Sequence, residues 1–385
     1  MSRPMADCKE LTAVLSVFCS PSRYTQGKNA TASLGGEMLG LGLRGLALIV
    51  AGRSASQMLS STWKTTFSAA RIEHAVHPFG GECSLAEIER VKAAARQRRA
   101  QVIVGAGGGK VLDTARAAAA DLDLPVVNCP TVASSDAPCS ALSVIYTEEG
   151  VFHEYRFYRK NPDLVLVDTQ VIAQGPPRLL VAGMGDALAT WFEARTCVAG
   201  HVKNMRGGAS TQSALALAEL CYRTLLEDGA DALRAVQAQV VTPALERLVE
   251  ANTLLSGLGF ESSGLAAAHA VHNGLTVAPA THAYFHGEKV AYGLLVQPVL
   301  EGQPRSVLEQ VLHFATEVGL PVTLAEIGLT DLPPESLQQV ANRATAKGET
   351  IHNEPFEVRP DLVADAIRAA DALGRAWKKH AGLTA

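Results

Sequence analysis

The chain has 385 residues, of which 48% are hydrophobic and 19% are charged, and its formal net charge is −4 at pH 7. This length suits two domains with sizeable cores better than one. The charge balance and the lack of a basic run give no indication of nucleic acid as a partner. No apolar run reaches the 18 or more residues needed to span a bilayer, so we expect no membrane association.

The cellular location is indicated by the N-terminus and by the cysteines. The first 20 residues, MSRPMADCKELTAVLSVFCS, place Asp7 and Glu10 ahead of their apolar run, which argues against a secretory signal. The seven cysteines are odd in number and form no CxxC pair. We therefore expect reduced thiols in a cytoplasmic protein.

The first half of the chain alternates between strand-like and helix-like stretches. Short apolar runs typical of buried parallel strands occur at 46–51, 101–104, 125–128 and 164–168. Helical periodicity occurs at 85–99, with Ser84 as its expected N-cap, and at 111–120. This rhythm predicts an α/β fold in which helices cover a parallel sheet.

From about Pro176 the sequence changes character, because strand-like runs nearly vanish. Helical stretches follow at 179–195, 210–226, 231–255, 263–273, 290–300, 306–318, 334–346 and 360–381. We predict a dinucleotide-binding α/β domain over 1–175 and an all-α domain over 176–385, with the boundary near the GPP of Gly175–Pro177.

A glycine loop stands between a predicted strand and a predicted helix. Residues 102–113 read VIVGAGGGKVLD. Glycine lets a phosphate approach the backbone closely, and the following helix N-terminus offers unpaired N–H donors. The loop departs from the GxGxxG fingerprint at Lys110 and from a Walker loop at Val104 and Val111. It predicts a phosphate site at the carboxyl end of a parallel strand, with a ligand-free turn as the alternative.

Histidines are concentrated between Gly264 and Gly293. His272 lies three residues after His269, within roughly 60° on the same helical face, and His286 follows 17 residues after His269. Upstream, Asp186 follows a glycine pair in GMGDALATWFEA. Two imidazoles and a carboxylate suit a divalent ion such as Zn²⁺ or Fe²⁺. A buried core histidine and a helix-capping aspartate are the alternatives.

Several long motifs occur in one order along the chain: PFGGECS, GAGGGKVLDTA, TVASSDAPCSALSVIY, GMGDALATWFEAR, FESSGLAAAHAVHNGL and HGEKVAYG. With them the chain closely resembles the glycerol dehydrogenase branch of the group III (iron-type) metal-dependent alcohol dehydrogenases, from about Ser20 to the last helices. The resemblance implies a dinucleotide-binding α/β domain, a helical domain and an active site in the cleft between them.

The resemblance also implies a set of site residues. The metal ligands would be Asp186, His269 and His286. Asp136 would meet the substrate hydroxyls, and Phe260 would form an aromatic wall of the pocket. The pyrophosphate and the rest of the cofactor would be bound around Gly107, Gly108, Gly109, Lys110, Asp113, Thr131, Ser140, Leu142 and Tyr146.

The implied reaction is the oxidation of glycerol to dihydroxyacetone, with the metal as a Lewis acid and hydride transfer to NAD or NADP. A preference for another small vicinal diol or a carbonyl is the main alternative. His272 is either a proton relay or, as we favour, a residue that only supports the site. Zn²⁺ is usual in this branch, with Fe²⁺ as the alternative, and we expect a homo-oligomer.

Two features depart from the family pattern. Gly52, followed by Arg53, stands where the family has an Asp that holds the adenosine ribose, which leaves NADP open beside NAD. About 18 N-terminal residues precede the usual start, and we assign them no function.

Two other functions are less consistent with the sequence. A cyclase of the dehydroquinate synthase type would need more basic residues near these motifs than Lys289, and an inactive scaffold would not need the Asp/His/His set.

Overall fold

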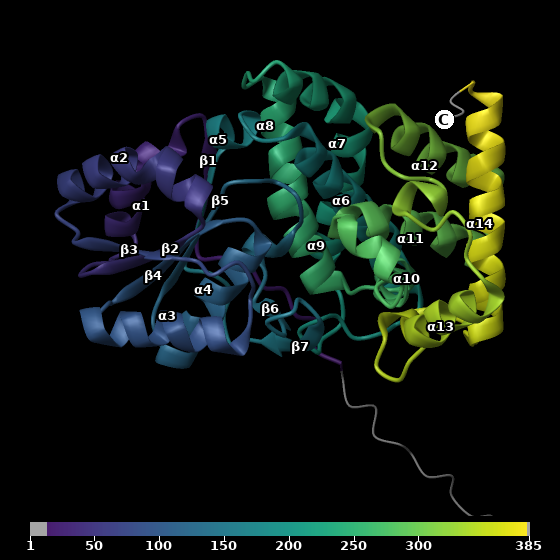
Figure 1. The fold of residues 1–385 in the computed structure, drawn as a ribbon, viewed down its shortest axis with the longest axis horizontal. Coiled ribbons are helices and arrows are strands. Elements are labelled where there is room, and N and C mark those ends of the chain that lie inside the picture. Colours follow the sequence, from purple (N-terminus) through teal and green to yellow (C-terminus); the bar gives the residue numbers. More distant parts are fainter. Residues whose placement is uncertain (1–13, 383–385) are drawn as a thin grey trace, which may run out of the picture.

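The computed structural model describes residues 14–382 (Figure 1). Its sheet has six strands, all parallel, in the order β1-β8-β5-β4-β2-β3. The strands are β1 (Tyr24–Gly27), β8 (Leu164–Asp168), β5 (Val126–Pro130), β4 (Val102–Gly107), β2 (Ala47–Ala51) and β3 (His74–Pro78). The predicted parallel α/β fold is confirmed, because helices follow most of these strands and cover both faces.

The two faces of the sheet have separate cores, as the alternation of side chains along a strand requires. On one side, Ile49 of β2 packs with α1 (Leu34–Gly40) and α2 (Arg53–Ala70). On the other side, Val50 packs with α3 (Leu85–Arg98) and α4 (Gly109–Leu122). Ser84 caps α3 through a hydrogen bond from the Glu87 amide, as predicted.

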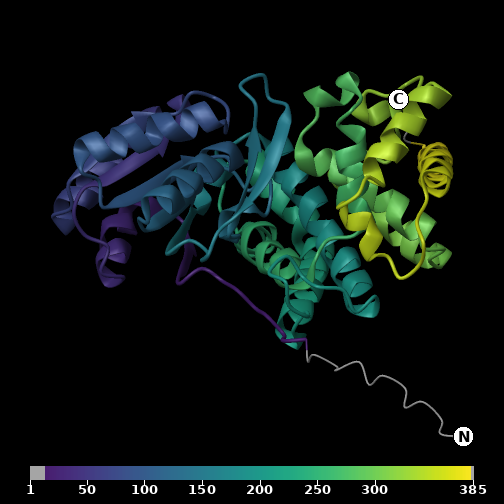
Figure 2. The same cartoon turned by 90° about the horizontal axis from the view of Figure 1, so that it is seen from below.

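A two-stranded antiparallel hairpin, β6 (Leu142–Tyr146) and β7 (Phe152–Phe157), follows the short helix η2 (Ala137–Cys139). Figure 2 shows this hairpin projecting between the sheet and the helical part of the molecule. Its position places β6 beside α4, and the Tyr155 hydroxyl of β7 lies 3.5 Å from the side-chain oxygen of Asn273 in the helical half.

The second half is helical, and the described residues after Asp168 form no named strand. Its helices are α5 (Thr169–Ala173), α6 (Pro177–Ala199), α7 (Gln212–Gln237), α8 (Pro243–Glu250), α9 (Ser256–Ser263), α10 (Ala267–Leu275), α11 (His286–Leu300), α12 (Arg305–Val318), α13 (Pro334–Ala344) and α14 (Pro360–His380).

One predicted helix is wrong. The stretch 231–255 is not one helix, because α7 continues to Gln237 and the chain then turns, with Gln239 at φ 57°. Pro243 starts α8 at a position where its missing N–H costs nothing. A π-helical turn, η3 (Ala251–Leu255), then joins α8 to α9.

One hydrophobic core runs from the sheet into the helices. Val165 and Val167 of β8 belong to the same buried cluster as Leu188 of α6 and Val290 of α11. The division into domains 1–175 and 176–385 therefore stays a prediction, although α5 ends at Ala173 and α6 begins at Pro177.

The N-terminal extension is partly described. Residues 1–13 lie outside the described part, and the segment after them crosses the helical half, where the Val17 amide donates to the Ala209 carbonyl. Within residues 14–382 no helix is both long and apolar enough to cross a membrane.

Candidate metal centre and glycine loop

Two glycines allow Asp186 and His286 to lie close together. Asp186 lies on α6, and His286 is the first residue of α11. A Cβ at Gly185 would lie 2.4 Å from the Gly287 carbonyl oxygen, and a Cβ at Gly287 would lie 1.8 Å from the Ala182 carbonyl oxygen. Only glycine permits this backbone approach, so the sequence of both helices fixes the distance between the carboxylate and the ring.

The three predicted ligands converge. His286 Nε2 lies 3.1 Å and His269 Nε2 lies 3.4 Å from Asp186 Oδ1, and the ligand atoms of all three side chains lie within 4.8 Å of one another. Asp186 is fully buried, yet its Oδ1 makes no hydrogen bond. A buried carboxylate oxygen without a hydrogen bond, facing two ring nitrogens, fits a divalent cation bound among them.

The charge pattern agrees with this fit. Burial alone raises the pKa of Asp186, but the attraction of the His286 and His269 rings outweighs burial and leaves this pKa below its usual range. The carboxylate is therefore ionised, as a metal ligand must be.

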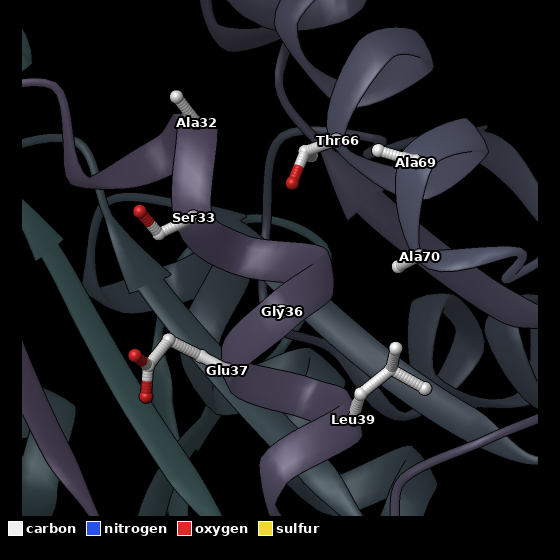
Figure 3. Close-up of a pocket in the computed structure, with 8 residues that line it drawn as sticks. All are labelled: Ala32, Ser33, Gly36, Glu37, Leu39, Thr66, Ala69 and Ala70. Atoms are coloured by element: carbon white, nitrogen blue, oxygen red, sulfur yellow. The ribbon is translucent and has the colours of Figure 1, made fainter.

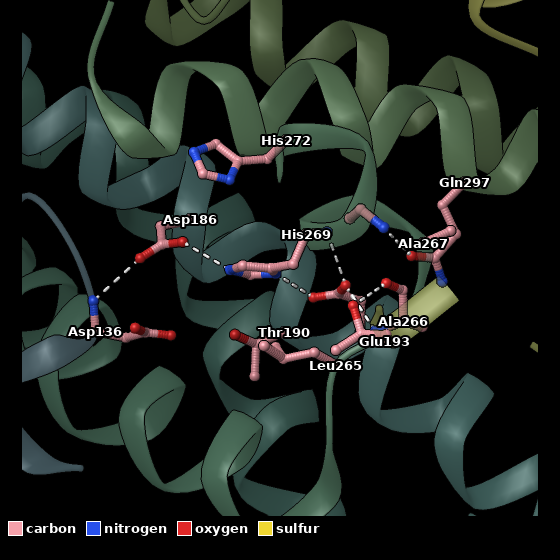
Figure 4. A network of polar contacts seen from close by, with 12 residues as sticks. Asp136, Asp186, Thr190, Glu193, Leu265, Ala266, Ala267, His269, His272 and Gln297 are labelled. Carbon is pink, nitrogen blue, oxygen red and sulfur yellow. Dashed lines mark hydrogen bonds and ion pairs between the residues drawn. The ribbon is translucent and has the colours of Figure 1, made fainter. Parts of the chain in front are cut away.

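His269 is held from behind by Glu193. Its Nδ1 lies 2.6 Å from Glu193 Oε2, and Figure 4 shows the line from Glu193 through His269 to Asp186. Burial lowers the pKa of His269, but the charges of Glu193 and Asp186 outweigh burial and raise this pKa well above its usual value. A carboxylate behind a histidine is the arrangement that orients ligating rings in metal proteins.

His272 contacts the other histidine. Its Nε2 lies 3.1 Å from His286 Nδ1, and its Nδ1 lies 3.1 Å from the side-chain oxygen of Asn273. Burial, followed by the positive charges of His286 and Lys289, lowers the pKa of His272 well below its usual value. His272 thus lies behind a predicted ligand and is itself absent from the converging set.

Asp136 lies next to the centre, at the N-terminal side of η2. Its backbone amide donates to Asp186 Oδ2 at 3.1 Å, and its own Oδ2 accepts a hydrogen bond from the Ser256 hydroxyl at 3.0 Å. Burial and the charge of Asp186 raise the pKa of Asp136 well above its usual value. Ser256 is the first residue of α9, and Phe260 is buried one turn after it on the same helix.

The glycine loop divides into two pairs. A Cβ at Gly105 would lie 2.8 Å from the Ala115 side chain, and one at Gly107 would lie 2.6 Å from the Val111 side chain, so this pair allows α4 to pack on β4. At Gly108 and Gly109 the nearest atoms would lie 3.5 and 3.8 Å away. This second pair leaves the backbone at the start of α4 open to a ligand.

The start of α4 has the features of an anion site. Gly108 provides no side-chain cap, and the first turn carries no acidic residue. The Thr131 amide donates to the Gly107 carbonyl, which places Thr131 beside the loop, and the loop faces Val132 and Ser135 of the segment that leads to Asp136. Phosphate at this helix end would therefore place the cofactor next to Asp136.

Three predicted cofactor residues surround a buried arginine, Arg116 of α4. Its guanidinium donates to the Ser140 hydroxyl at 3.2 Å and to the Leu142 carbonyl, and it lies 3.5 Å from the carboxylate of Asp113. Burial raises the pKa of Asp113 to about 6. Arg116 ties α4 to β6, and the roles of these three residues toward the cofactor stay predictions.

Lys110 and Tyr146 also lie close together. The Lys110 ammonium forms an ion pair with Glu82 and lies 5.4 Å from the centre of the Tyr146 ring. The Tyr146 amide donates to the Cys83 carbonyl, which joins β6 to the PFGGECS segment. Both side chains thus border the same end of the sheet as the glycine loop.

The sequence analysis did not identify Glu193, Arg116 or Ser256. Glu193 carried a usable signal, because it lies seven residues, or about two turns, after Asp186 on the same face of a mostly apolar helix. Arg116 and Ser256 had no comparable signal, since their partners come from remote segments.

A cavity of about 360 Å³ lies elsewhere, between α1 and α2 (Figure 3). It is lined largely by small side chains, and the carboxylate of Glu37 at its edge is already paired with Arg23. It is remote from the Asp/His/His group and provides no cluster of reactive side chains.

Comparison with known proteins shows the family of this chain. Residues 21–169 match the sequence profile of iron-containing alcohol dehydrogenases. A glycerol dehydrogenase of Thermotoga maritima is 53% identical over 93% of this chain and 97% of its own. A glycolaldehyde reductase of Halobacterium salinarum is 48% identical over 94% of this chain and 98% of its own.

A solved structure shows the same fold. The crystal structure of a probable glycerol dehydrogenase from Sinorhizobium meliloti superposes with a TM-score of 0.89 at 42% identity, and covers 94% of this chain and 99% of its own. The resemblance found in the sequence motifs is confirmed. The chain belongs to the iron-containing alcohol dehydrogenase family.

Proposed function

We propose that this enzyme oxidises glycerol to dihydroxyacetone and transfers the hydride to NAD or NADP. The observation that carries the proposal is the convergence of Asp186, His269 and His286 on one point beside Asp136, with the glycine loop of α4 facing the same segment. The glycerol dehydrogenase of Thermotoga maritima, at 53% identity, supports this substrate.

The three side chains would hold Zn²⁺ or Fe²⁺, because two imidazoles and one carboxylate suit either ion. When bound, the ion would supply Lewis acidity that favours loss of the alcohol proton. The cofactor would supply the hydride acceptor.

The protein would orient the substrate through Asp136. The backbone of Asp136 is fixed by Asp186, and its carboxyl group is held by Ser256 while lying next to the centre. A carboxyl group in this position can accept a hydrogen bond from a substrate hydroxyl. We propose that it binds a substrate hydroxyl, and that Phe260 closes the pocket on the α9 side.

We assign His272 a positioning role. Because it contacts His286 Nδ1, it would keep His286 Nε2 directed at the metal. In this role His272 does not carry away the proton that the substrate alcohol loses.

The cofactor preference is set at the end of β2. Gly52 is the N-cap of α2, a Cβ there would meet nothing within 4 Å, and Arg53 follows it as the first residue of the helix. This site lacks the carboxylate that would repel a 2′-phosphate, so we propose that NADP is accepted beside NAD. Comparison of kcat/KM for the two cofactors tests this point, and an NAD preference above a hundredfold would contradict it.

The glycolaldehyde reductase of Halobacterium salinarum favours a second candidate, reduction of a small hydroxyaldehyde at the same site. Small polar pockets separate close analogues only modestly. We also propose that the enzyme is a cytoplasmic homo-oligomer and that its small-molecule partner is a polyol. Size-exclusion chromatography would test the oligomeric state.

The main experiment measures metal content and glycerol oxidation in parallel. We expect Asp186→Ala and His269→Ala to lose bound metal and activity together. Full metal content in both variants would remove the ligand assignment. Activity on glycolaldehyde alone, with metal intact, would favour the second candidate.

A further inference from the structure

The helix that carries His269 is capped by side chains from distant parts of the chain. Ala266, at the N-terminus of α10, provides no side-chain cap. Instead, the amides of Ala266 and His269 both donate to Glu193 Oε1, at 2.8 and 3.0 Å. The Ala267 amide donates to Glu354 at 3.2 Å, and the Ala268 amide donates to Gln297 at 3.0 Å.

Glu193 therefore uses its two oxygens differently. Oε1 is occupied by two backbone donors, which fixes the plane and the direction of the carboxylate. Oε2 is left to face His269 Nδ1 at 2.6 Å. Glu193 is fully buried, so water cannot replace either contact.

This fixed carboxylate decides which nitrogen of His269 carries a proton. An ionised carboxylate only accepts hydrogen bonds, so Nδ1 must be the donor. The lone pair of the neutral ring then lies on Nε2, which faces Asp186 Oδ1 at 3.4 Å.

We propose that Glu193 is a positioning residue that fixes His269 as an Nδ1–H, Nε2-metal ligand, while its other oxygen anchors the N-terminus of α10. This inference rests on the proposed metal centre and goes beyond its three ligands. It assigns the metal affinity in part to a residue that touches neither metal nor substrate.

The substitution Glu193→Gln tests this role sharply. The two backbone donors require the Gln carbonyl oxygen at the Oε1 position, so the side-chain NH₂ must face His269 Nδ1 as a donor. Nδ1 then has to accept, and the ring proton moves to Nε2, where it can donate to Asp186 Oδ1. The helix cap is preserved while the ligand nitrogen is blocked.

Glu354→Gln is the matched control. Glu354 is also buried and also accepts a hydrogen bond from an amide at the start of α10, but no hydrogen bond or ion pair joins its side chain to His269, Asp186 or His286. Both variants thus exchange a buried capping carboxyl group for an amide, and only Glu193 faces a ligand ring.

The measurement is the Zn²⁺ affinity of the full-length enzyme, by competition with a chelator at one pH, together with the melting temperature of each metal-free protein. We expect Glu193→Gln to lose about 10- to 100-fold in affinity. The Zn²⁺ affinity of Glu354→Gln should stay within about twofold of the wild-type affinity, which is small beside the loss expected for Glu193→Gln. Equal affinities in wild type and Glu193→Gln would overturn the inference.

A second measurement does not depend on any variant folding. In Zn²⁺-loaded wild type with ¹⁵N-labelled histidine, NMR should show the proton of His269 on Nδ1 and the metal on Nε2. Metal on Nδ1, or an Nδ1 without a proton, would overturn the inference even if Glu193→Gln fails to fold. Absence of Zn²⁺ binding by wild type would instead reject the proposed function.

Discussion

At the scale of single residues, sequence motifs predicted the side chains of the candidate centre, and the structure shows how these side chains contact one another. Asp186, His269 and His286 were predicted as one group, and they converge. The roles of Glu193 and His272 could not be predicted from the sequence. A residue that orients a ligating histidine is recognised by the ring nitrogen that it contacts. That information exists only in three dimensions.

His272 gives a prediction at this scale. His272→Ala removes the partner of His286 Nδ1, so we expect a lower metal affinity, by about tenfold as is typical for residues that orient a ligand. We expect the pH dependence of kcat, measured at saturating metal, to keep its shape. The loss of one titration limb with unchanged affinity would instead identify His272 as a proton relay.

At the scale of elements, strands buried on both faces were predicted well, because β2, β4, β5 and β8 consist mostly of apolar residues. β3 was missed because it is an edge strand, with two histidines and partly exposed side chains. α2 was missed because its exposed face is rich in Ser and Thr, which obscures the buried stripe of Leu59, Trp63 and Phe67.

The contact between α6 and α11 gives a second prediction. Gly287→Ala places a methyl group 1.8 Å from the Ala182 carbonyl oxygen, so the helices must separate and carry Asp186 away from His286. We expect a lower melting temperature and loss of metal. Gly287 lies in the first turn of α11 and has no positive φ, so alanine would be tolerated there without the close contact, and the sign of the change tests that contact.

Gly36→Ala is the control for this substitution. Gly36 lies in α1, where an added Cβ would meet nothing within 4 Å. We expect its melting temperature to be unchanged or higher, with full metal content. An equal loss of stability in both variants would show that the close helix contact is not the cause.

The cap of α10 gives a third prediction, which concerns pH. Burial, together with the charge of Glu301, raises the pKa of Glu354 from 4.5 to about 8. Between these values the folded protein keeps a proton that the unfolded chain has released. Stability therefore falls as pH rises through this window, by at most about 1.4 kcal/mol per pH unit.

Glu354→Gln removes this titration. We expect the melting temperature of the variant, relative to wild type, to rise between pH 5 and pH 8 and then to level off. A difference between the two proteins that is constant across this range would show that Glu354 does not titrate as described.

At the scale of the whole molecule, the family and the parallel sheet followed from motifs and strand rhythm, and both are confirmed. The position of the glycine loop relative to the Asp/His/His group could not be predicted from periodicity, because it depends on contacts between remote segments. Arg116 joins α4 to β6, Ser256 holds Asp136, and Gly287 lies against α6. Each of these links spans a sequence distance over which local patterns carry no signal.

The most direct test of the account is an anomalous diffraction map of the Zn²⁺-loaded enzyme, recorded at the zinc absorption edge. We predict one strong peak at about 2.0–2.2 Å from Asp186 Oδ1, His269 Nε2 and His286 Nε2. A fully occupied zinc peak elsewhere, with these three side chains left without metal, would contradict the account.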